Sequence, residues 1–418
     1  METIVRRVST DDCLELASIM MHAYPGLEGI TEDSISKLAQ NLRDELSKES
    51  TEMIYGAYRG SKLLGAIRLH QFTMTLRAVP VRIGGIAGVC VHLLHKKEKV
   101  SRDLLSFALK TFHSWGIQLV SLYPFQTGFY KKMGFGYGAM KHQYRLKPDA
   151  FPKEATKINV TYLSIEDRAD MLACYRYFSQ SRTGMLERQE ADFNEMFQHG
   201  NSVVGVRHNG EITGYLSFGF RRPNPQYYQK YDLFVEQFVY RTPDALAELC
   251  SFLNSQSDQV QQIVLNTQDE DFHYLFLDPM NGRFDSFETA ALETTVTAVG
   301  AMYRVLDVKK LLAELQACQF GPETCRLKII VHDNFFESEH GETVIHFKNG
   351  MIMDLQDDGE YDVAMTIRIS EFSSLIVGAV GFRSLFDYGL VKLSNLSYMS
   401  LIHRLFAVQH KPRNDLNF

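Results

Sequence analysis

The sequence has no long apolar run, and this argues against a protein whose helices span a membrane. No apolar segment reaches the length of about 20 residues that a helix needs to cross a bilayer. The N-terminal segment METIVRRVSTDD has no apolar stretch of the kind found in signal peptides. The sequence therefore predicts a cytoplasmic protein without a membrane partner.

Cysteine is scarce and scattered along the chain. The six cysteines stand at positions 13, 90, 174, 250, 318 and 325, and no CxxC pair occurs. This spacing indicates neither a zinc site nor a disulfide framework, and reduced thiols are typical of cytoplasmic proteins. No grouping of His, Cys, Asp or Glu has the spacing of metal ligands, so no metal is expected.

A surplus of positive charge is also missing. The 418 residues carry a formal net charge of −6, which argues against a nucleic-acid partner and is weakly compatible with cationic substrates. Hydrophobic residues make up 45% of the chain and charged residues 22%, as in folded globular proteins. A chain of this length predicts two or three domains.

The stretch 84–137 holds the pattern around which the rest of the chain is interpreted. An apolar run at 83–91 is followed by a basic loop at 95–99 and an amphipathic helical pattern. A second apolar run at 117–122 leads to the segment FYKKMGF, residues 129–135. The order strand, basic turn, helix, strand aims the N–H groups of a helix N-terminus at a phosphate.

This order, ending in FYKKMGF, resembles the acetyl-CoA core of GNAT N-acetyltransferases. The GFY–GFGYG ending, the chain length and the terminal Phe418 narrow the resemblance to the Eis-like (enhanced intracellular survival) acetyltransferases. The resemblance covers the whole chain. It implies an α+β protein with two tandem GNAT-like mixed-sheet domains followed by a sterol-carrier-like domain, assembled as a homo-oligomer, a hexamer in the family.

Turn-forming segments between the predicted elements support this division. We place an N-terminal GNAT domain at 1–150, a second, degenerate GNAT-like domain at 151–302 and a sterol-carrier-like domain at 303–418. Two predicted hairpins carry glycine pairs of equal spacing, Gly56 with Gly65 and Gly205 with Gly214, which indicates an internal duplication. Residues 136–146 are expected to close the first domain. The second copy has Arg-Thr-Pro-Asp-Ala at 241–245, without glycine or lysines, so a phosphate cradle is not expected there.

The resemblance assigns residues to the binding of acetyl-CoA. The splayed strand corresponds to Val89, Cys90 and Val91, the pyrophosphate loop to Lys97, Glu98, Lys99, Val100, Ser101 and Arg102, and a further contact region to Phe125 and Gln126. Lys99 stands where the family has glycine, which leaves three interpretations open. The lysine side chains bind the phosphates, or CoA binding is weakened or lost, or the loop is an ordinary solvated turn.

Two residues receive catalytic roles from the resemblance. Tyr130 corresponds to the general acid that protonates the departing thiolate, and the α-carboxylate of Phe418 to the general base. On residue type alone, a tyrosine packed in the core is the favoured interpretation of Tyr130, and a frayed end is the usual interpretation of a terminal residue such as Phe418. The FYKKMGF context favours the general acid, and the matching terminal Phe favours the general base. His22, Tyr24 and Glu28 are weaker candidates for an acceptor pocket. Cys90 is not expected to be a nucleophile, because GNAT chemistry proceeds by direct attack and cysteine is often simply buried.

The sequence thus predicts an acetyl-CoA-dependent N-acetyltransferase. The acceptor would be a primary amine: a small cationic amine, an aminoglycoside or a lysine side chain. The alternative is a non-catalytic ligand-binding or regulatory protein on the same scaffold, for which the change to Lys99 is the best support.

Overall fold

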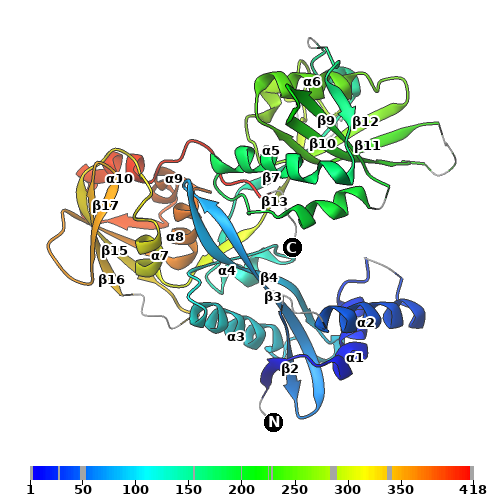
Figure 1. Cartoon of the computed structure of the whole chain (residues 1–418). Helices are drawn as coiled ribbons and strands as arrows, with labels where there is room; N and C mark the ends of the chain where they lie inside the picture. The colour runs from blue at the N-terminus through cyan, green and yellow to red at the C-terminus, as the bar shows by residue number, and fades with distance from the viewer. Residues whose placement is uncertain are drawn as a thin grey trace.

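The computed structural model describes residues 3–26, 29–47, 53–153, 156–198, 200–224, 226, 229–282, 290–336 and 341–414. Three mixed sheets, each with its own helices, make up this part of the chain (Figure 1). The predicted α+β class is confirmed.

The first sheet has the strand order β1-β2-β3-β4-β5-β14-β6. Its strands are β1 Ile4–Arg7, β2 Met53–Arg59, β3 Lys62–Leu76, β4 Val79–Val91, β5 Leu119–Leu122, β14 Met302–Val305 and β6 Gly136–Tyr137. Its helices are α1 Cys13–Ala23, α2 Glu32–Leu46, α3 Val100–Ser114 and α4 Thr127–Lys131.

The second sheet repeats this order as β8-β9-β10-β11-β12-β7-β13. Its strands are β8 Val160–Tyr162, β9 Ser202–His208, β10 Glu211–Arg221, β11 Tyr231–Tyr240, β12 Val260–Thr267, β7 Met140–Leu146 and β13 Thr295–Val299, with helices α5 Arg168–Gln180 and α6 Pro243–Asn254. In both sheets one central pair is parallel, β4 with β5 and β11 with β12. The shared order confirms the duplication that the two glycine-bearing hairpins indicated.

The two sheets exchange strands, which the sequence did not predict. Of the segment 136–146 that was expected to close the first domain, only β6 pairs in the first sheet, whereas β7 pairs with β12 and β13 in the second. In return β14, which follows the second domain in the chain, pairs with β5 and β6. The expectation was wrong for Met140–Leu146 because alternating polarity identifies a strand and one buried face, not the sheet edge that receives it.

The third sheet has the order β17-β16-β15-β18-β19. Its strands are β15 Cys325–His332, β16 Glu342–Lys348, β17 Met351–Gln356, β18 Val363–Arg368 and β19 Val391–Leu393, with helices α7 Val308–Glu314, α8 Ile369–Ile376, α9 Phe382–Asp387 and α10 Met399–Phe406. Helix α8 is buried along its whole length and contacts β14 and β6 of the first sheet.

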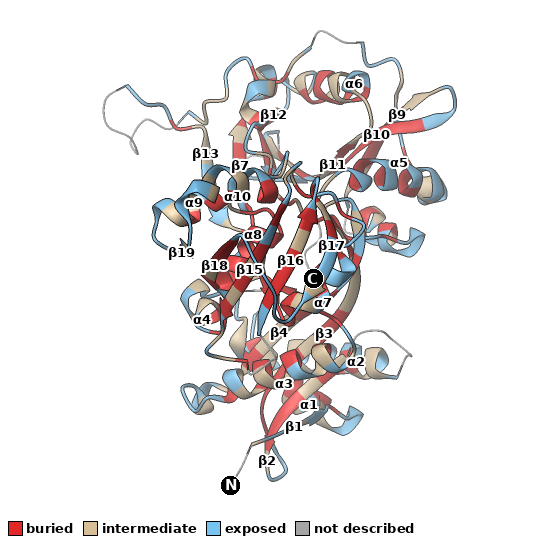
Figure 2. Ribbon diagram, turned by 90° about the vertical axis from the view of Figure 1, so that its left-hand side faces the viewer, coloured by how far each residue is buried: buried red, intermediate tan, exposed pale blue. Residues whose placement is uncertain are grey.

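The long β3–β4 hairpin ties the first domain to the third. Its buried residues Met74, Leu76, Val81 and Ile83 belong to the same hydrophobic cluster as the core of the third sheet. Figure 2 shows buried parts of β3, β4, β15 and β16 in red. The first domain is therefore packed against the third through one continuous core rather than joined by a linker.

Candidate active site

A cavity of about 660 Å³ opens between the end of β4, the turn before α3 and the segment before α4. Its wall holds the sequence-predicted residues Val89, Cys90, Val91, Lys97, Lys99, Val100, Ser101, Arg102, Phe125 and Gln126. The structure thus brings together every residue predicted to bind acetyl-CoA except Glu98.

Strand β4 separates from β5 at this cavity. The parallel pairing runs from Ile83 to Ile86, while β4 continues to Val91. Gly88 has a φ of +57° at the point where the register between β3 and β4 shifts, and Gly88 and Val89 form a bulge there. Beyond Ile86 the β5-facing edge of β4 has no strand partner among the described residues, and its backbone groups are open to a ligand.

Tyr24 supports this open edge. Its hydroxyl donates a hydrogen bond to the carbonyl oxygen of Val89 at 2.7 Å, and its side chain forms part of the cavity wall. Burial raises the pKa of Tyr24 to about 12. Tyr24 was only a weak candidate from sequence, because nothing in the local pattern of α1 indicates which strand its hydroxyl reaches.

Cys90 is buried next to Val89, and burial raises the pKa of its thiol to about 12. A thiol with this pKa is protonated near neutral pH and is a poor nucleophile. The environment of Cys90 therefore favours direct attack over a covalent intermediate.

The turn before α3 adopts the backbone conformation that glycine usually supplies. Lys97 has a φ of +66° and Lys99 a φ of +67°, both in the left-handed region, which disfavours an L-residue by roughly 1–2 kcal/mol. Lys99 is the N-cap of α3, and no side chain caps the first N–H groups of the helix. The first residues of α3 and the two lysines line one cavity, and an uncapped helix N-terminus beside basic side chains is an arrangement that suits phosphate.

Glu98 lies apart from the cavity wall. Its carboxylate accepts a hydrogen bond from Arg59 at 2.8 Å and lies 3.2 Å from Nδ1 of His95. The hydrogen bond from Arg59, with His95, lowers the pKa of Glu98. The one anionic side chain of the loop is thus paired with Arg59 and lies next to His95, away from the cavity wall.

The second domain differs at the matching position. Helix α6 begins with Pro243, and the side chain of Thr242 accepts a hydrogen bond from the N–H of Ala245 at 3.2 Å. The helix end that is open in α3 is therefore capped by the protein itself in α6. This agrees with the absence of glycine and lysines from residues 241–245.

Tyr130 lies on α4, between cavity-wall residues that precede and follow it. Its ring is 1% exposed and packs against Phe129 and Phe135, with centroid distances of 5.1 and 5.9 Å, and against Phe125 at 5.7 Å. Burial, with a further contribution from the neighbouring Tyr24, raises the pKa of Tyr130. The phenol is thus held as a protonated donor.

A buried arginine holds the end of the segment that carries Tyr130. Arg304 on β14 is fully buried, and its Nη1 donates to the carbonyl oxygen of Met133 at 2.5 Å while its Nη2 pairs with Asp333 at 2.5 Å. Gly134 has a φ of +82°, and a Cβ on it would lie 1.5 Å from Nη1 of Arg304. Sequence reasoning missed this contact, although an arginine inside an apolar strand was a signal for it.

Helix α4 is also paired with the third domain. Lys131 forms an ion pair of 2.7 Å with the buried Glu371 at the start of α8. Burial opposes ionisation of Glu371, but the hydrogen bonds from Lys131 and Ser370 outweigh it and lower its pKa. The first and third domains therefore hold α4 jointly.

Phe418 and Glu28 lie outside the described residues, and their roles stay predictions. Within the described ranges, no group of three or more His, Cys, Asp or Glu side chains is placed to hold a metal ion. The same part of the chain holds no helix with the length and apolar character of a membrane span.

Three family models match the sequence. Residues 5–138 and 184–305 match models described as acetyltransferase (GNAT) domains, and residues 308–413 match a sterol carrier protein domain. This chain contains two GNAT acetyltransferase domains. The two GNAT domains followed by a sterol carrier domain are the Eis-like arrangement that the sequence resembled, and the N-acetyltransferase class is confirmed.

Solved structures share this fold over 100% of both chains. A GCN5-related N-acetyltransferase from Anabaena variabilis ATCC 29413 is similar with a TM-score of 0.82 at 15% identity. A GCN5-related N-acetyltransferase from Kribbella flavida has a TM-score of 0.77 at 17% identity, and Eis1 from Mycobacterium abscessus 0.76 at 16%. A search of curated protein sequences found no match.

Proposed function

We propose that this GNAT protein transfers the acetyl group of acetyl-CoA to a primary amine by direct attack. One observation carries the proposal: a single cavity joins the open edge of β4, the uncapped N-terminus of α3 and the segment that leads into α4. The acyl donor needs an extended backbone for its pantetheine arm and donors for its phosphates, and the first two walls offer these. It also needs a proton for its thiolate, a role that we assign to Tyr130 on α4, next to the cavity-wall residue Phe129.

The roles follow from the chemistry of the walls. The backbone of Val89 and Val91 binds the amides of the pantetheine arm, and the start of α3 with Lys97 and Lys99 binds the pyrophosphate. The amine nitrogen forms a bond to the acetyl carbon, the carbon–sulfur bond breaks, and Tyr130 gives its proton to the leaving thiolate. Tyr24 holds the end of β4 in place beside that donor.

The general base is proposed from the sequence alone. A base must take the proton that the attacking nitrogen loses, and the α-carboxylate of Phe418 is the candidate. Appending a short tag after Phe418 turns this carboxylate into an amide and should remove most activity while CoA binding persists. Native turnover by a protein whose tag is intact by mass spectrometry would place the base elsewhere.

The proposal also concerns the class of amine that accepts the acetyl group. The negative net charge and the amine chemistry of the fold favour a small cationic amine, an aminoglycoside or a lysine side chain. The experiment is thiol release from acetyl-CoA against a panel of these amines, with calorimetric titration of CoA as its companion. Binding without release for every amine would favour the non-catalytic alternative, and no binding would overturn both.

We further infer from the resemblance that the protein is a cytoplasmic homo-oligomer, a hexamer in the family. Light scattering at micromolar concentration tests the assembly, and a monomeric mass would contradict it.

A further inference from the structure

The third domain places a short turn, residues 333–336, against the first domain. Asp333 directly follows β15, and its Oδ1 accepts hydrogen bonds from the N–H of Phe335 at 3.0 Å and the N–H of Phe336 at 3.3 Å. Phe336 belongs to the hydrophobic cluster that contains the buried face of α3, and its ring centroid lies 6.1 Å from that of His113 on this helix. The turn is therefore part of the core that supports the cavity.

The Asp333 carboxylate is linked to one cavity wall through Arg304. Its Oδ2 pairs with Nη2 of Arg304 at 2.5 Å, and Nη1 of the same guanidinium donates to the carbonyl oxygen of Met133 at 2.5 Å. Met133 lines the cavity, and its N–H donates to the carbonyl oxygen of Tyr130 at 2.9 Å. Arg304 is thus a single link between a carboxylate of the third domain and a residue of the cavity wall.

The same turn is linked to a second cavity wall through Phe335. The guanidinium carbon of Arg102 lies 5.7 Å from the centroid of the Phe335 ring, within the range of a cation–π attraction. Arg102 is in the first turn of α3 and lines the cavity. A long exposed side chain loses rotamer freedom when it binds a ligand, and a ring that already restrains it reduces this cost.

The pair of Arg304 and Asp333 is completely enclosed. Their side chains are 0% and 3% exposed, so salt and water screen the pair little. A Cβ on Gly134 would lie 1.5 Å from Nη1 of Arg304, so the chain beside Met133 leaves room for the guanidinium only because it carries glycine there. Taking two charges out of water costs free energy that their attraction does not always repay, so stability alone is a weak explanation for this pair.

We propose that Asp333 is a positioning residue of the acetyl-CoA site, through which the third domain fixes Met133 by way of Arg304 and Arg102 by way of Phe335. The inference rests on the proposed function, which takes the cavity to be the CoA site. Asp333 does not line the cavity itself and acts only through these two contacts. The third domain thereby takes part in cofactor binding at the first.

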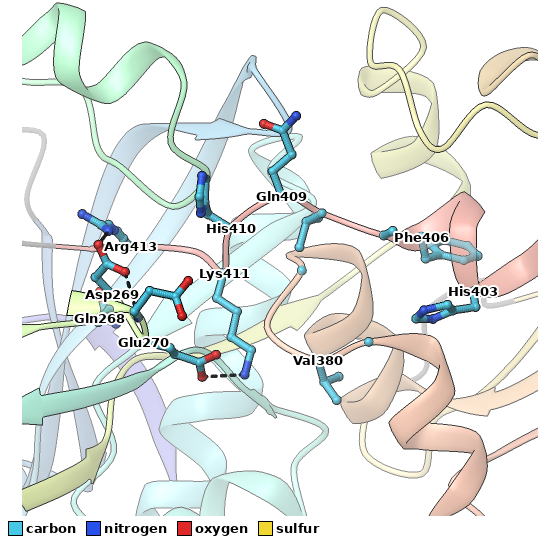
Figure 3. A pocket seen from close by; sticks show the side chains of 15 residues that line it. Gln268, Asp269, Glu270, Val380, His403, Phe406, Gln409, His410, Lys411 and Arg413 are labelled. Carbon is cyan, nitrogen blue, oxygen red and sulfur yellow. Dashed lines mark hydrogen bonds and ion pairs between the residues drawn. The ribbon is translucent and has the colours of Figure 1, made fainter. Parts of the chain in front are cut away.

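Other ion pairs between domains lie apart from this cavity. Lys411 and Arg413 of the third domain pair with Glu270 and Asp269 of the second (Figure 3). None of these four residues lines the CoA cavity. Glu270→Gln therefore removes an ion pair between domains without changing a cavity wall, and it serves as the first control.

A second control matches the burial of Asp333. Glu248 in the second domain has a side chain that is 8% exposed and lies 2.9 Å from Nε2 of His208. Glu248→Gln neutralises a buried, paired carboxylate, as Asp333→Asn does. Its effect on CoA binding and turnover measures what a general loss of stability would produce.

The test uses full-length proteins, calorimetric titration of CoA and steady-state kinetics with the best amine of the panel. Asp333→Asn keeps an oxygen for the two N–H groups but loses the charge that holds Arg304. We expect it to weaken CoA binding severalfold and to lower kcat about tenfold, since small displacements of reacting groups are costly. Phe335→Leu should weaken CoA binding about threefold with an unchanged kcat, because it removes only the cation–π contact. Both controls should match wild type in both measurements.

Combined variants separate positioning from a general loss of order. In a protein that already carries Arg102→Ala, Phe335→Leu should have no further effect on CoA affinity. In a protein that carries Tyr130→Phe, Asp333→Asn should lower kcat little further. A merely structural role would instead reduce affinity and kcat by the same factor in both backgrounds.

Each outcome decides the proposal. Wild-type affinity and kcat in Asp333→Asn overturn it, and so do equal losses in the single and combined backgrounds. If Asp333→Asn does not fold, the Phe335 variants decide alone, and wild-type affinity in Phe335→Leu overturns the proposal. A wild-type protein that binds CoA but acetylates no amine refutes the proposed function, while the titrations, which need no acceptor, still decide whether the third domain positions Arg102. A wild-type protein that binds no CoA overturns both.

Discussion

The hydroxyl of Tyr24 and the carbonyl oxygen of Val89 are joined by a hydrogen bond of 2.7 Å across the open end of β4. Tyr24 is the C-cap residue of α1, and Val89 forms the bulge of β4 together with Gly88. The bond satisfies one backbone group of a strand end that has lost its partner strand. It also brings the Tyr24 phenol close enough to Tyr130 to affect the pKa of that residue.

Tyr24→Phe should therefore weaken the binding of acetyl-CoA without abolishing it. Loss of the donor leaves the Val89 carbonyl without its partner, and such a bond contributes about 0.5–1.5 kcal/mol to stability. We expect the free energy of unfolding in urea to fall by about 1 kcal/mol, and the KM for acetyl-CoA to rise severalfold. Wild-type values for both quantities would show that the bond does not support the strand end.

Tyr130→Phe should lower kcat by roughly a hundred- to ten-thousand-fold, because it removes the proton donor and keeps the ring packing. The dissociation constant of CoA, measured by calorimetry, should change little. Since burial raises the pKa of Tyr130, the phenol keeps its proton up to and beyond its ordinary pKa of about 10. Any loss of wild-type activity between pH 7 and about 9 must then come from another group. A wild-type kcat in the variant would remove Tyr130 from the mechanism.

Variants in the turn before α3 test separately the charge of its lysines and the left-handed conformation of its backbone. Lys97→Ala with Lys99→Ala should weaken CoA binding and reduce its dependence on salt, because two cations near the phosphates are lost. Lys110→Ala, an exposed lysine on the same helix, is the control and should bind as wild type does. Equal affinities for the double variant and the control would show that the side chains do not bind phosphate.

Lys99→Gly removes the positive charge but places a residue that readily adopts the left-handed backbone conformation. We expect weaker CoA binding together with a free energy of unfolding higher by up to about 1 kcal/mol, since the strain of the left-handed residue is relieved. Chemical denaturation measures the second effect. Lower stability than in Lys99→Ala would mean that the conformation carries no strain.

Gly134→Ala should lower the free energy of unfolding by about 3 kcal/mol or more. The new Cβ would collide with the buried Arg304, and the positive φ disfavours alanine. Gly128→Ala on α4 is the matched control. A Cβ there meets nothing within 4 Å, and alanine in a helix interior is more favourable than glycine by roughly 0.5–1 kcal/mol. Similar urea midpoints for the two variants would contradict the close contact at Gly134.

The chain's local patterns predicted most of the first domain's elements. The apolar run, basic turn, amphipathic helix and second apolar run became β4, the turn at Lys97 and Lys99, α3 and β5. This worked because helical and strand periodicity are local properties and the resemblance supplied the order. The residues around the cavity were predictable for the same reason: they lie within a few positions of those elements.

What is not local could not be predicted. Tyr24 reaches Val89 from 65 positions away, and Arg304 reaches Met133 from 171. The exchange of β7 and β14 between sheets depends on which edge each strand meets after the domains pack. The pairing of Arg413 with Asp269 likewise depends on the path of the chain between domains.

The sequence by itself determined the elements, the duplication and the chemistry of the loop before α3, since these follow from side-chain periodicity and from residue types at short spacing. Only the tertiary structure decided that Lys99 adopts the conformation of the missing glycine, that Glu98 is paired away from the cavity and that Arg304 holds the segment bearing Tyr130. The physical reason is that burial and pairing are properties of neighbours in space. Those neighbours come from segments that the chain brings together only when its domains have folded and packed against one another.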